Sequence, residues 1–179
     1  FPFAGDQLFY SRRIGQPPAF HPAGAVEDRP DSTTLLGALK VSGKTNQGFS
    51  FGLLTAMTDQ EQVAVVDGLG AREVVVAPRA ALAVLRAQQD FRQGDTVVGG
   101  IITQVRRDLD PAEAAAAQVA EQATAAGLDL THYWAGREYF VRAVAVGSDV
   151  RGEAGAISRL QLSSARYYQR PIDGRTDYD

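Results

Sequence analysis

Residues 35–58 constrain the fold more than any other stretch, because two runs of eleven residues flank a two-residue turn, Asn46-Gln47. Side chains in a β-strand alternate between faces, so every second residue shares a face. The more apolar faces of the two arms carry Leu35, Leu39 and Val41, and Phe49, Phe51, Leu53 and Met57. The other faces carry mostly small or polar residues. This alternation predicts an antiparallel hairpin with one apolar face.

Two interpretations of this hairpin stay open. A transmembrane β-strand needs about 9–11 residues to cross the hydrocarbon, which is the length of each arm. The membrane-facing candidates are then Leu39, Val41, Phe49, Phe51 and Leu53, and the lumen-facing candidates are Lys40 and Lys44. In a soluble protein the same hairpin is half-buried, and the two lysines belong to a solvated face. Neither interpretation makes the lysines catalytic.

Composition excludes several classes of protein. The 179 residues carry a net charge of −3, so no strong field attracts nucleic acid. Cysteine is absent, which excludes disulfides and cysteine-ligated metals. No apolar run approaches the roughly 18 residues of a membrane helix. A mean hydropathy of −0.16 is compatible with a membrane barrel, since half of each strand faces a polar interior.

The rest of the chain is expected to form strands joined by alternating short and long connections. Strands are expected over about 72–90, with a bend at Pro78, and over about 96–107, 128–134 and 138–149. The short connections are 46–47, 91–95 and 135–137, and the long ones are 59–71, 108–126 and the segment from 150. The Ala-rich residues 111–126 lie between Pro111 and Gly127, which predicts a helix there. A loop and a short helix are expected over 150–165.

The sequence therefore predicts an all-β fold, an antiparallel up-and-down meander of about 6–8 strands with one short helix in a long loop. Residues 1–34 form an irregular N-terminal segment with one candidate strand, and residues 35–150 form the meander. Residues 151–179 form a loop, a candidate strand and a polar tail. Outer-membrane barrels have short periplasmic turns and longer extracellular loops, so the alternation favours part of such a barrel.

Aromatic residues gather near the short connections. Between residues 35 and 150 they are Phe49, Phe51, Phe91, Tyr133, Trp134, Tyr139 and Phe140. Four of them, Phe91, Tyr133, Trp134 and Tyr139, are candidates for an aromatic girdle at a membrane interface. The alternative is that aromatics beside hairpin turns pair across strands in any sheet.

The sequence contains no complete motif for catalysis, cofactor binding or metal binding. Ser42-Gly43-Lys44-Thr45 lacks the upstream glycine spacing and the following helix of a phosphate-binding loop. His21 and His132 have no second histidine at metal spacing. Asp108 and Asp110 follow a strand, where such a pair is more often a turn or a helix cap than a glycosidase dyad. Arg142, among apolar neighbours, suggests either an interior ion pair or a position near the membrane interface.

Several stretches together resemble a known bacterial family. They are Leu8–Gly15 (LFYSRRIG), Leu36–Thr45 (LGALKVSGKT), Phe51–Thr58 (FGLLTAMT), Gln89–Arg92 (QDFR), Thr96–Gly100 (TVVGG), Arg107–Leu109 (RDL) and Ser163–Pro171 (SSARYYQRP). In this order they resemble the domain of unknown function 5916, which commonly follows a family 9-like carbohydrate-binding module in envelope proteins. The resemblance implies an outer-membrane β-barrel in a Gram-negative bacterium and carries no catalytic residues. The module and the later strands are not in this chain, so it is expected to be an internal piece of a longer protein.

Three hypotheses of function follow. The leading one is a segment of an outer-membrane barrel that acts as anchor or pore, with the lipid bilayer as partner and carbohydrate bound through the absent module. The first alternative is a soluble β-sheet module that binds a carbohydrate or a small apolar ligand. It predicts that Phe49, Phe51, Leu53 and Met57 are buried under the Ala-rich helix. The second alternative is a glycoside hydrolase that uses loop carboxylates. Under the leading hypothesis, we expect no catalytic activity, cofactor or nucleic acid partner for this segment.

Overall fold

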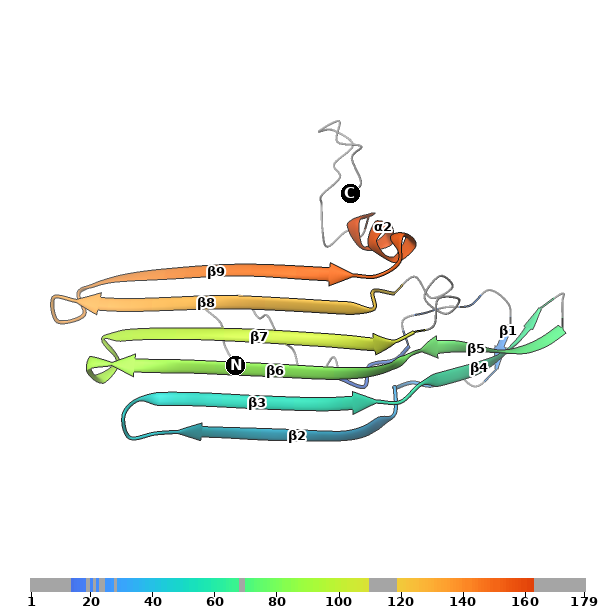
Figure 1. Ribbon diagram of the computed structural model, residues 1–179, viewed down its shortest axis with the longest axis horizontal. Helices are drawn as coiled ribbons and strands as arrows, with labels where there is room; N and C mark the ends of the chain where they lie inside the picture. Colours follow the sequence, from blue (N-terminus) through green and yellow to red (C-terminus); the bar gives the residue numbers. More distant parts are fainter. Residues whose placement is uncertain are drawn as a thin grey trace, which may run out of the picture.

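A six-stranded antiparallel sheet dominates the computed structural model, which describes residues 14–18, 20, 22, 25–27, 29–67, 70–109 and 119–162 (Figure 1). Its strands are β2 (Leu35–Lys44), β3 (Phe49–Thr58), β6 (Arg79–Phe91), β7 (Thr96–Asp108), β8 (Gln122–Trp134) and β9 (Tyr139–Arg151). They follow one another across the sheet in the order β2-β3-β6-β7-β8-β9, each paired antiparallel with the next. The predicted antiparallel β-architecture is thus confirmed, and β2 and β9 form the two edges of the described sheet.

A smaller sheet extends beyond one end of the large one (Figure 1). It pairs β1 (Ala25–Glu27), β4 (Glu61–Asp67) and β5 (Gly70–Ala77) in the order β1-β4-β5. Its own small core consists of Val63, Val65 and Val76, with Phe20 and Val74 packed against them. After β9 comes the short helix α2 (Ala154–Leu162), as the sequence predicted for 150–165. Within the described ranges, no helix is long and apolar enough to cross a membrane.

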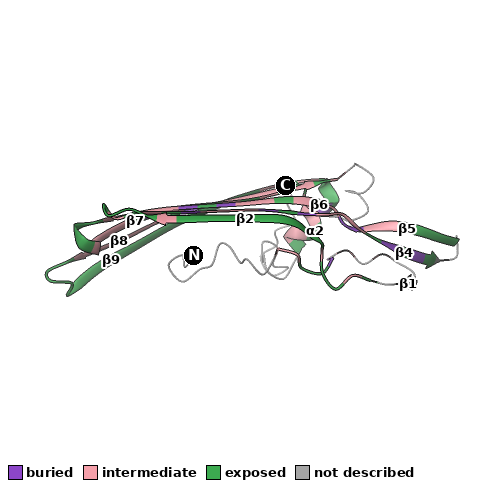
Figure 2. Ribbon diagram, turned by 90° about the horizontal axis from the view of Figure 1, so that it is seen from below, coloured by how far each residue is buried: buried purple, intermediate pink, exposed green. Residues whose placement is uncertain are grey.

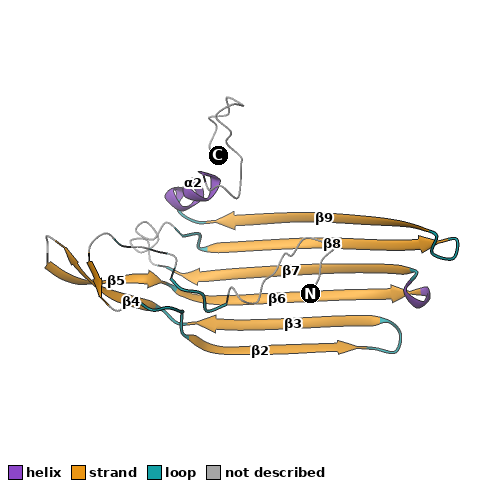
Figure 3. Cartoon of the chain, turned by 180° about the vertical axis from the view of Figure 1, so that it is seen from behind, coloured by secondary structure: helices purple, strands orange, loops and turns teal. Residues whose placement is uncertain are grey.

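The short connections all lie at one end of the large sheet, which we call the turn end (Figure 3). They join β2 to β3, β6 to β7, and β8 to β9. The β6–β7 connection contains the 3-10 turn η2 (Arg92–Gly94), and the β8–β9 connection is the four-residue turn 135–138. The opposite end carries the small sheet, the β7–β8 connection and α2, and we call it the loop end. The predicted alternation of short and long connections is therefore present.

The β2–β3 turn differs from the predicted two-residue loop by one residue. The Thr45 amide donates to the Phe49 carbonyl at 2.8 Å, and Gly48 occupies the left-handed region with φ +83°. Gly48 thus makes a three-residue loop, and Val41 pairs with Leu53. A two-residue loop would have paired Val41 with Gly52, because each residue of slip moves a side chain to the other face. The extra glycine therefore brings the apolar faces of both arms to the same side.

Replacing Gly48 with Ala is expected to destabilise the protein more than the same change at Gly136. Both glycines have positive φ, which costs an alanine about 1–2 kcal/mol. A Cβ at Gly48 would also lie 2.5 Å from the Asp90 carbonyl oxygen, whereas a Cβ at Gly136 would have no atom within 4 Å. Urea unfolding of both variants measures the difference. Equal free energies of unfolding would contradict this account of the turn.

The structure corrects two predictions around Pro78. The expected connection 59–71 contains β4, and the expected single strand 72–90 is two strands, β5 and β6, in different sheets. Proline has no amide hydrogen to donate to a ladder, so pairing stops at Pro78 and resumes at Arg79. The chain changes sheet at this residue rather than bending within one strand.

The predicted helix at 111–126 is wrong over its last part. Gln122–Ala126 are the first residues of β8, which pairs on both sides with β7 and β9. Residues 110–118 lie outside the described residues. Alanine favours helix on its own, but two neighbouring ladders supply all the backbone partners that a strand needs. Context therefore overrides propensity here.

Candidate functional site

Alternate residues of all six strands form one continuous surface, which we call the apolar face. The pairing register places its large apolar members side by side. These members are Leu39, Val41, Phe49, Phe51, Leu53, Met57, Leu85, Phe91, Val98, Ile102, Leu128, Leu130, Trp134, Tyr139 and Val141. All five predicted membrane-facing residues lie on this face. The other side of the sheet, which carries Lys40 and Lys44, is the mixed face.

At the centre of the large sheet, the apolar face is more exposed than the mixed face. Leu85 is 47% exposed, whereas its neighbour Val84 on the mixed face is 1% exposed. Ile102 is 45% exposed, and its neighbour Ile101 is 4% exposed. Viewed nearly edge-on, the six strands form a single thin layer (Figure 2). Exposed apolar surface of this extent marks a surface that contacts lipid or another apolar partner.

Charge is confined to the loop end of the apolar face. Its charged residues in the large sheet are Arg79, Arg106, Asp108, Asp149 and Arg151. Asp59, just after β3, accepts hydrogen bonds from Arg79 Nε and Nη2 at 3.2 and 2.8 Å, and these bonds hold the pKa of its carboxyl below the ordinary value. From there to the turn end, the described strands place no Asp, Glu, Lys or Arg on this face. An uncharged zone of this kind is what hydrocarbon tolerates.

The apolar zone crosses the strands obliquely. Residues that the pairing register places opposite one another across the sheet form rows, and the limits of the zone are compared with these rows. At the turn end the outermost aromatic pair is Trp134 with Tyr139; Phe91 lies one row further in, and Phe49 two rows further in. At the loop end Met57 on β3 is level with Arg151 on β9. Both limits therefore shift in the same direction from β9 toward β3. From β9 to β3 the limit at the turn end shifts by two rows, about 13 Å along the strands, over four strand spacings, about 19 Å across them. This shift corresponds to an angle of roughly 35° between the limit and the rows.

The predicted interface aromatics divide between the two faces. Trp134 lies between Tyr139 and His132 on the apolar face, with ring centroids 6.0 and 5.8 Å away, and Phe91 shares this face. Tyr133 lies on the mixed face, where its ring is 5.8 Å from that of Phe140. The guanidinium of Arg137 lies 5.6 Å from the Tyr133 ring centroid. Successive residues of a strand point to opposite faces, so Tyr133 and Trp134 cannot belong to one girdle.

The mixed face carries a polar network near the turn end. Lys44 Nζ lies 3.6 Å from Asp90 Oδ2, and Gln88 Nε2 donates to Asp90 Oδ1 at 2.9 Å. Arg86 Nη2 donates to Gln88 Oε1 at 3.3 Å and to Asp129 Oδ2 at 3.0 Å, and Arg86 Nη1 also pairs with Asp129 Oδ1. The network links β2, β6 and β8.

The Arg86–Asp129 pair was not predicted from the sequence. Arg86 is on β6 and Asp129 is on β8, so the pair reaches across β7 at Gly99. A Cβ at Gly99 would lie 2.8 Å from Arg86 Cζ, so a side chain at this position would displace the guanidinium. The available signal was a charged residue in each of two apolar strands, with glycine in the strand between them.

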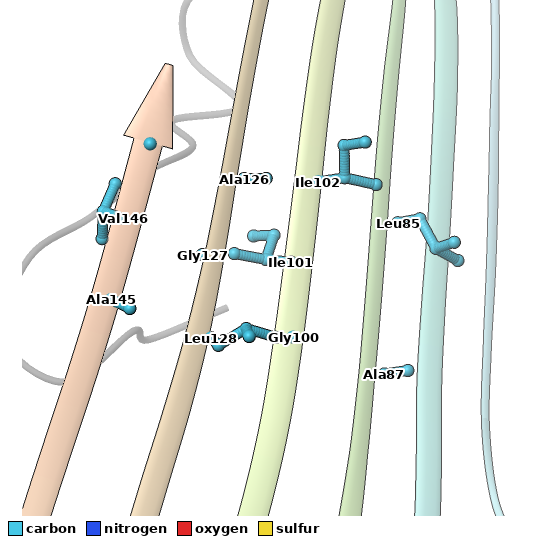
Figure 4. Close-up of a pocket in the computed structure, with 11 residues that line it drawn as sticks. Leu85, Ala87, Gly100, Ile101, Ile102, Ala126, Gly127, Leu128, Ala145 and Val146 are labelled. Carbon is cyan, nitrogen blue, oxygen red and sulfur yellow. The ribbon is translucent and has the colours of Figure 1, made fainter.

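A shallow hollow of about 580 Å³ lies on the apolar face (Figure 4). Leu85, Ile102 and Leu128 line it together with smaller residues such as Gly100 and Ala145. Every lining residue is aliphatic or glycine, so the hollow offers no polar group to orient a substrate. It is a depression in the apolar face rather than a reaction site.

The candidates for chemistry that lie in described strands are not brought together. Asp108 lies opposite Arg79 at the end of β7, and Asp110 and His21 lie outside the described residues. His132 Nδ1 lies 2.8 Å from Thr96 Oγ1. Ser42 and Lys44 belong to a strand rather than to a phosphate-binding loop. Among the residues that the structure describes, no group of His, Cys, Asp or Glu could hold a metal ion.

Fold and surface together define an antiparallel β-sheet protein with one open apolar face and one face of mixed polarity. A family model described as Domain of unknown function (DUF5916) matches residues 3–149, and the chain belongs to this family. Comparison with curated proteins and with solved structures found no match.

Proposed function

We propose that this chain is a segment of an outer-membrane β-barrel, serving as membrane anchor or pore wall of a carbohydrate-binding envelope protein. The apolar face is the surface that contacts lipid, and the mixed face lines the interior. The short connections lie on the periplasmic side, and the small sheet β1-β4-β5 lies on the outer side. The link to carbohydrate rests on the family resemblance.

The observation that carries this proposal is the oblique, uncharged zone on the apolar face. Strands of membrane barrels are tilted by about 35–45° to the barrel axis. The hydrocarbon layer is perpendicular to that axis, so its limits must cross tilted strands obliquely. An angle of roughly 35° between the zone and the rows meets this requirement. A soluble sheet that packs on its own core has no reason to shift both limits together.

Exposure favours this proposal over the soluble alternative. A soluble module requires a cover over the apolar face, and the Ala-rich segment was the expected cover. The described part of that segment belongs to β8, and Met57, Phe49 and Phe51 are 50, 39 and 38% exposed. Of the carboxylates predicted for the second alternative, hydrolysis of a glycoside, Asp108 lies opposite Arg79 at the end of β7, and Asp110 lies outside the described residues.

Cysteine labelling tests the proposal directly, because the chain has no cysteine of its own. Phe51→Cys is compared with Ser42→Cys, a matched exposed position on the mixed face of the neighbouring strand. Each variant is refolded with lipid vesicles or in plain buffer and treated with a charged thiol reagent. We expect vesicles to protect Phe51→Cys, since lipid excludes charged reagents, while Ser42→Cys stays reactive.

Three results would count against the proposal. Equal labelling of Phe51→Cys in vesicles and in buffer would show that lipid does not cover the position. Protection in plain buffer would show that the protein itself buries it, as a soluble core requires. A folded, monomeric chain that stays soluble without detergent would exclude the anchor role.

A further inference from the structure

We infer that the mixed face attracts anions, so that the interior proposed above favours anionic solutes over cationic ones. This inference rests on the proposed function for its biological setting, but the charge of the face can be measured separately. The chain as a whole has a net charge of −3, so composition alone points the other way.

Basic residues outnumber acidic ones on this face of the large sheet. The basic members are Lys40, Lys44, Arg86, Arg107 and Arg142, and the acidic members are Asp90 and Asp129. Five positive and two negative charges leave a net charge of +3 on the mixed face. The acidic surplus of the chain therefore lies elsewhere.

Three of the five basic groups are more exposed than either acidic group. The side chain of Asp129 is 14% exposed and holds the buried guanidinium of Arg86, and that of Asp90 is 24% exposed and contacts Gln88 and Lys44. The side chain of Lys44 is 66% exposed, and Lys40 and Arg142 are exposed as well. A solute that approaches the mixed face therefore meets ammonium and guanidinium groups before it meets carboxylates.

Ser42 is the position where this field is best measured. It lies on the mixed face of β2 between Lys40 and Lys44, two residues from each, so both side chains start about 7 Å from its own. Its partner in β3 is Gly52, which brings no charge. Asp90 Oδ2 lies 3.6 Å from Lys44 Nζ and offsets the charge of Lys44, and one unit charge at about 7 Å in water at physiological salt favours an anion over a cation by about twofold.

The experiment compares reaction rates of Ser42→Cys with an anionic sulfonate and a cationic trimethylammonium methanethiosulfonate. The same variant unfolded in urea gives the intrinsic ratio of the two rates. We expect the folded protein to raise the anion-to-cation ratio about twofold, with a larger rise at low salt. Adding Lys40→Gln and Lys44→Gln is expected to return the ratio to its unfolded value. Ser32→Cys, in the exposed segment beside Asp31, is expected to show no preference for the anion.

The outcomes separate this inference from the proposed function. An unchanged or lowered ratio at Ser42→Cys would overturn the inference, even if vesicles protect Phe51→Cys. A raised ratio that the two glutamine substitutions do not lower would also overturn it, because the lysines would not be the source. A raised ratio with Phe51→Cys unprotected would support the basic face and overturn the membrane setting.

Discussion

Replacing Ala145 with Arg is expected to prevent stable insertion into lipid vesicles, whereas replacing Val146 with Arg leaves insertion nearly unchanged. The two residues are neighbours in β9, and both are exposed, but Ala145 lies on the apolar face and Val146 on the mixed face. An arginine on the lipid side near the middle of the membrane costs about 2–4 kcal/mol. An arginine on the interior side keeps its water. The measurement is the free energy of unfolding from vesicles in urea for the two variants and the parent chain.

This pair of variants compares the two faces at neighbouring positions. Both introduce the same side chain into the same edge strand, so net charge changes equally, and the larger loss of strand propensity, at Val146, opposes the expected order. A soluble sheet would treat the two exposed positions alike. Equal effects, or a larger effect at Val146, would contradict a lipid-facing apolar surface.

Replacing Asp129 with Ala is expected to destabilise the protein by about 3–5 kcal/mol, the other large effect. Arg86 is 6% exposed, and its Nη1 and Nη2 both donate to the Asp129 carboxylate. In the variant, the guanidinium would keep its charge in the sheet but lose this carboxylate. The double variant Arg86→Met with Asp129→Leu is expected to recover most of the loss, since it removes both charges. Urea unfolding of the parent, of Arg86→Met, of Asp129→Leu and of the double variant gives the coupling free energy between the two side chains.

The control for this prediction is the exposed pair of the same network. Lys44→Gln removes a partner of Asp90 that is largely in solvent, and exposed ion pairs contribute about 0–1 kcal/mol. If Asp129→Ala cost no more than Lys44→Gln, the Arg86–Asp129 pair would have no role in holding β6 and β8 across β7.

The hairpin, the strand order and the sidedness could be predicted because they are local. Alternation over β2 and β3 depends only on the two-residue period of a strand, and short connections force neighbouring strands to pair antiparallel. Within each arm, the apolar positions were therefore assigned to one face from the sequence alone. Gly48 decides how the two arms combine, because one extra residue in the loop moves the apolar face of a whole arm to the other side of the sheet.

Predictions that depended on distant partners failed or were missed. Gln122–Ala126 look helical by composition, and only the ladders from β7 and β9 make them a strand. Pro78 stops one ladder and starts a strand of another sheet, which no local rule specifies. Arg86 and Asp129 are 43 residues apart, and their contact depends on Gly99 in the strand between them.

The three-residue loop ending at Gly48 also implies a counting rule for changes in chain length. Deleting one residue from a hairpin loop inverts the sidedness of everything downstream unless a second deletion or a compensating bulge restores it. Insertions or deletions of two residues keep every downstream side chain on its original face. Tight connections should therefore vary between relatives in steps of two, whereas long connections at the other end, where the chain can re-enter a strand at any phase, are free to gain or lose single residues.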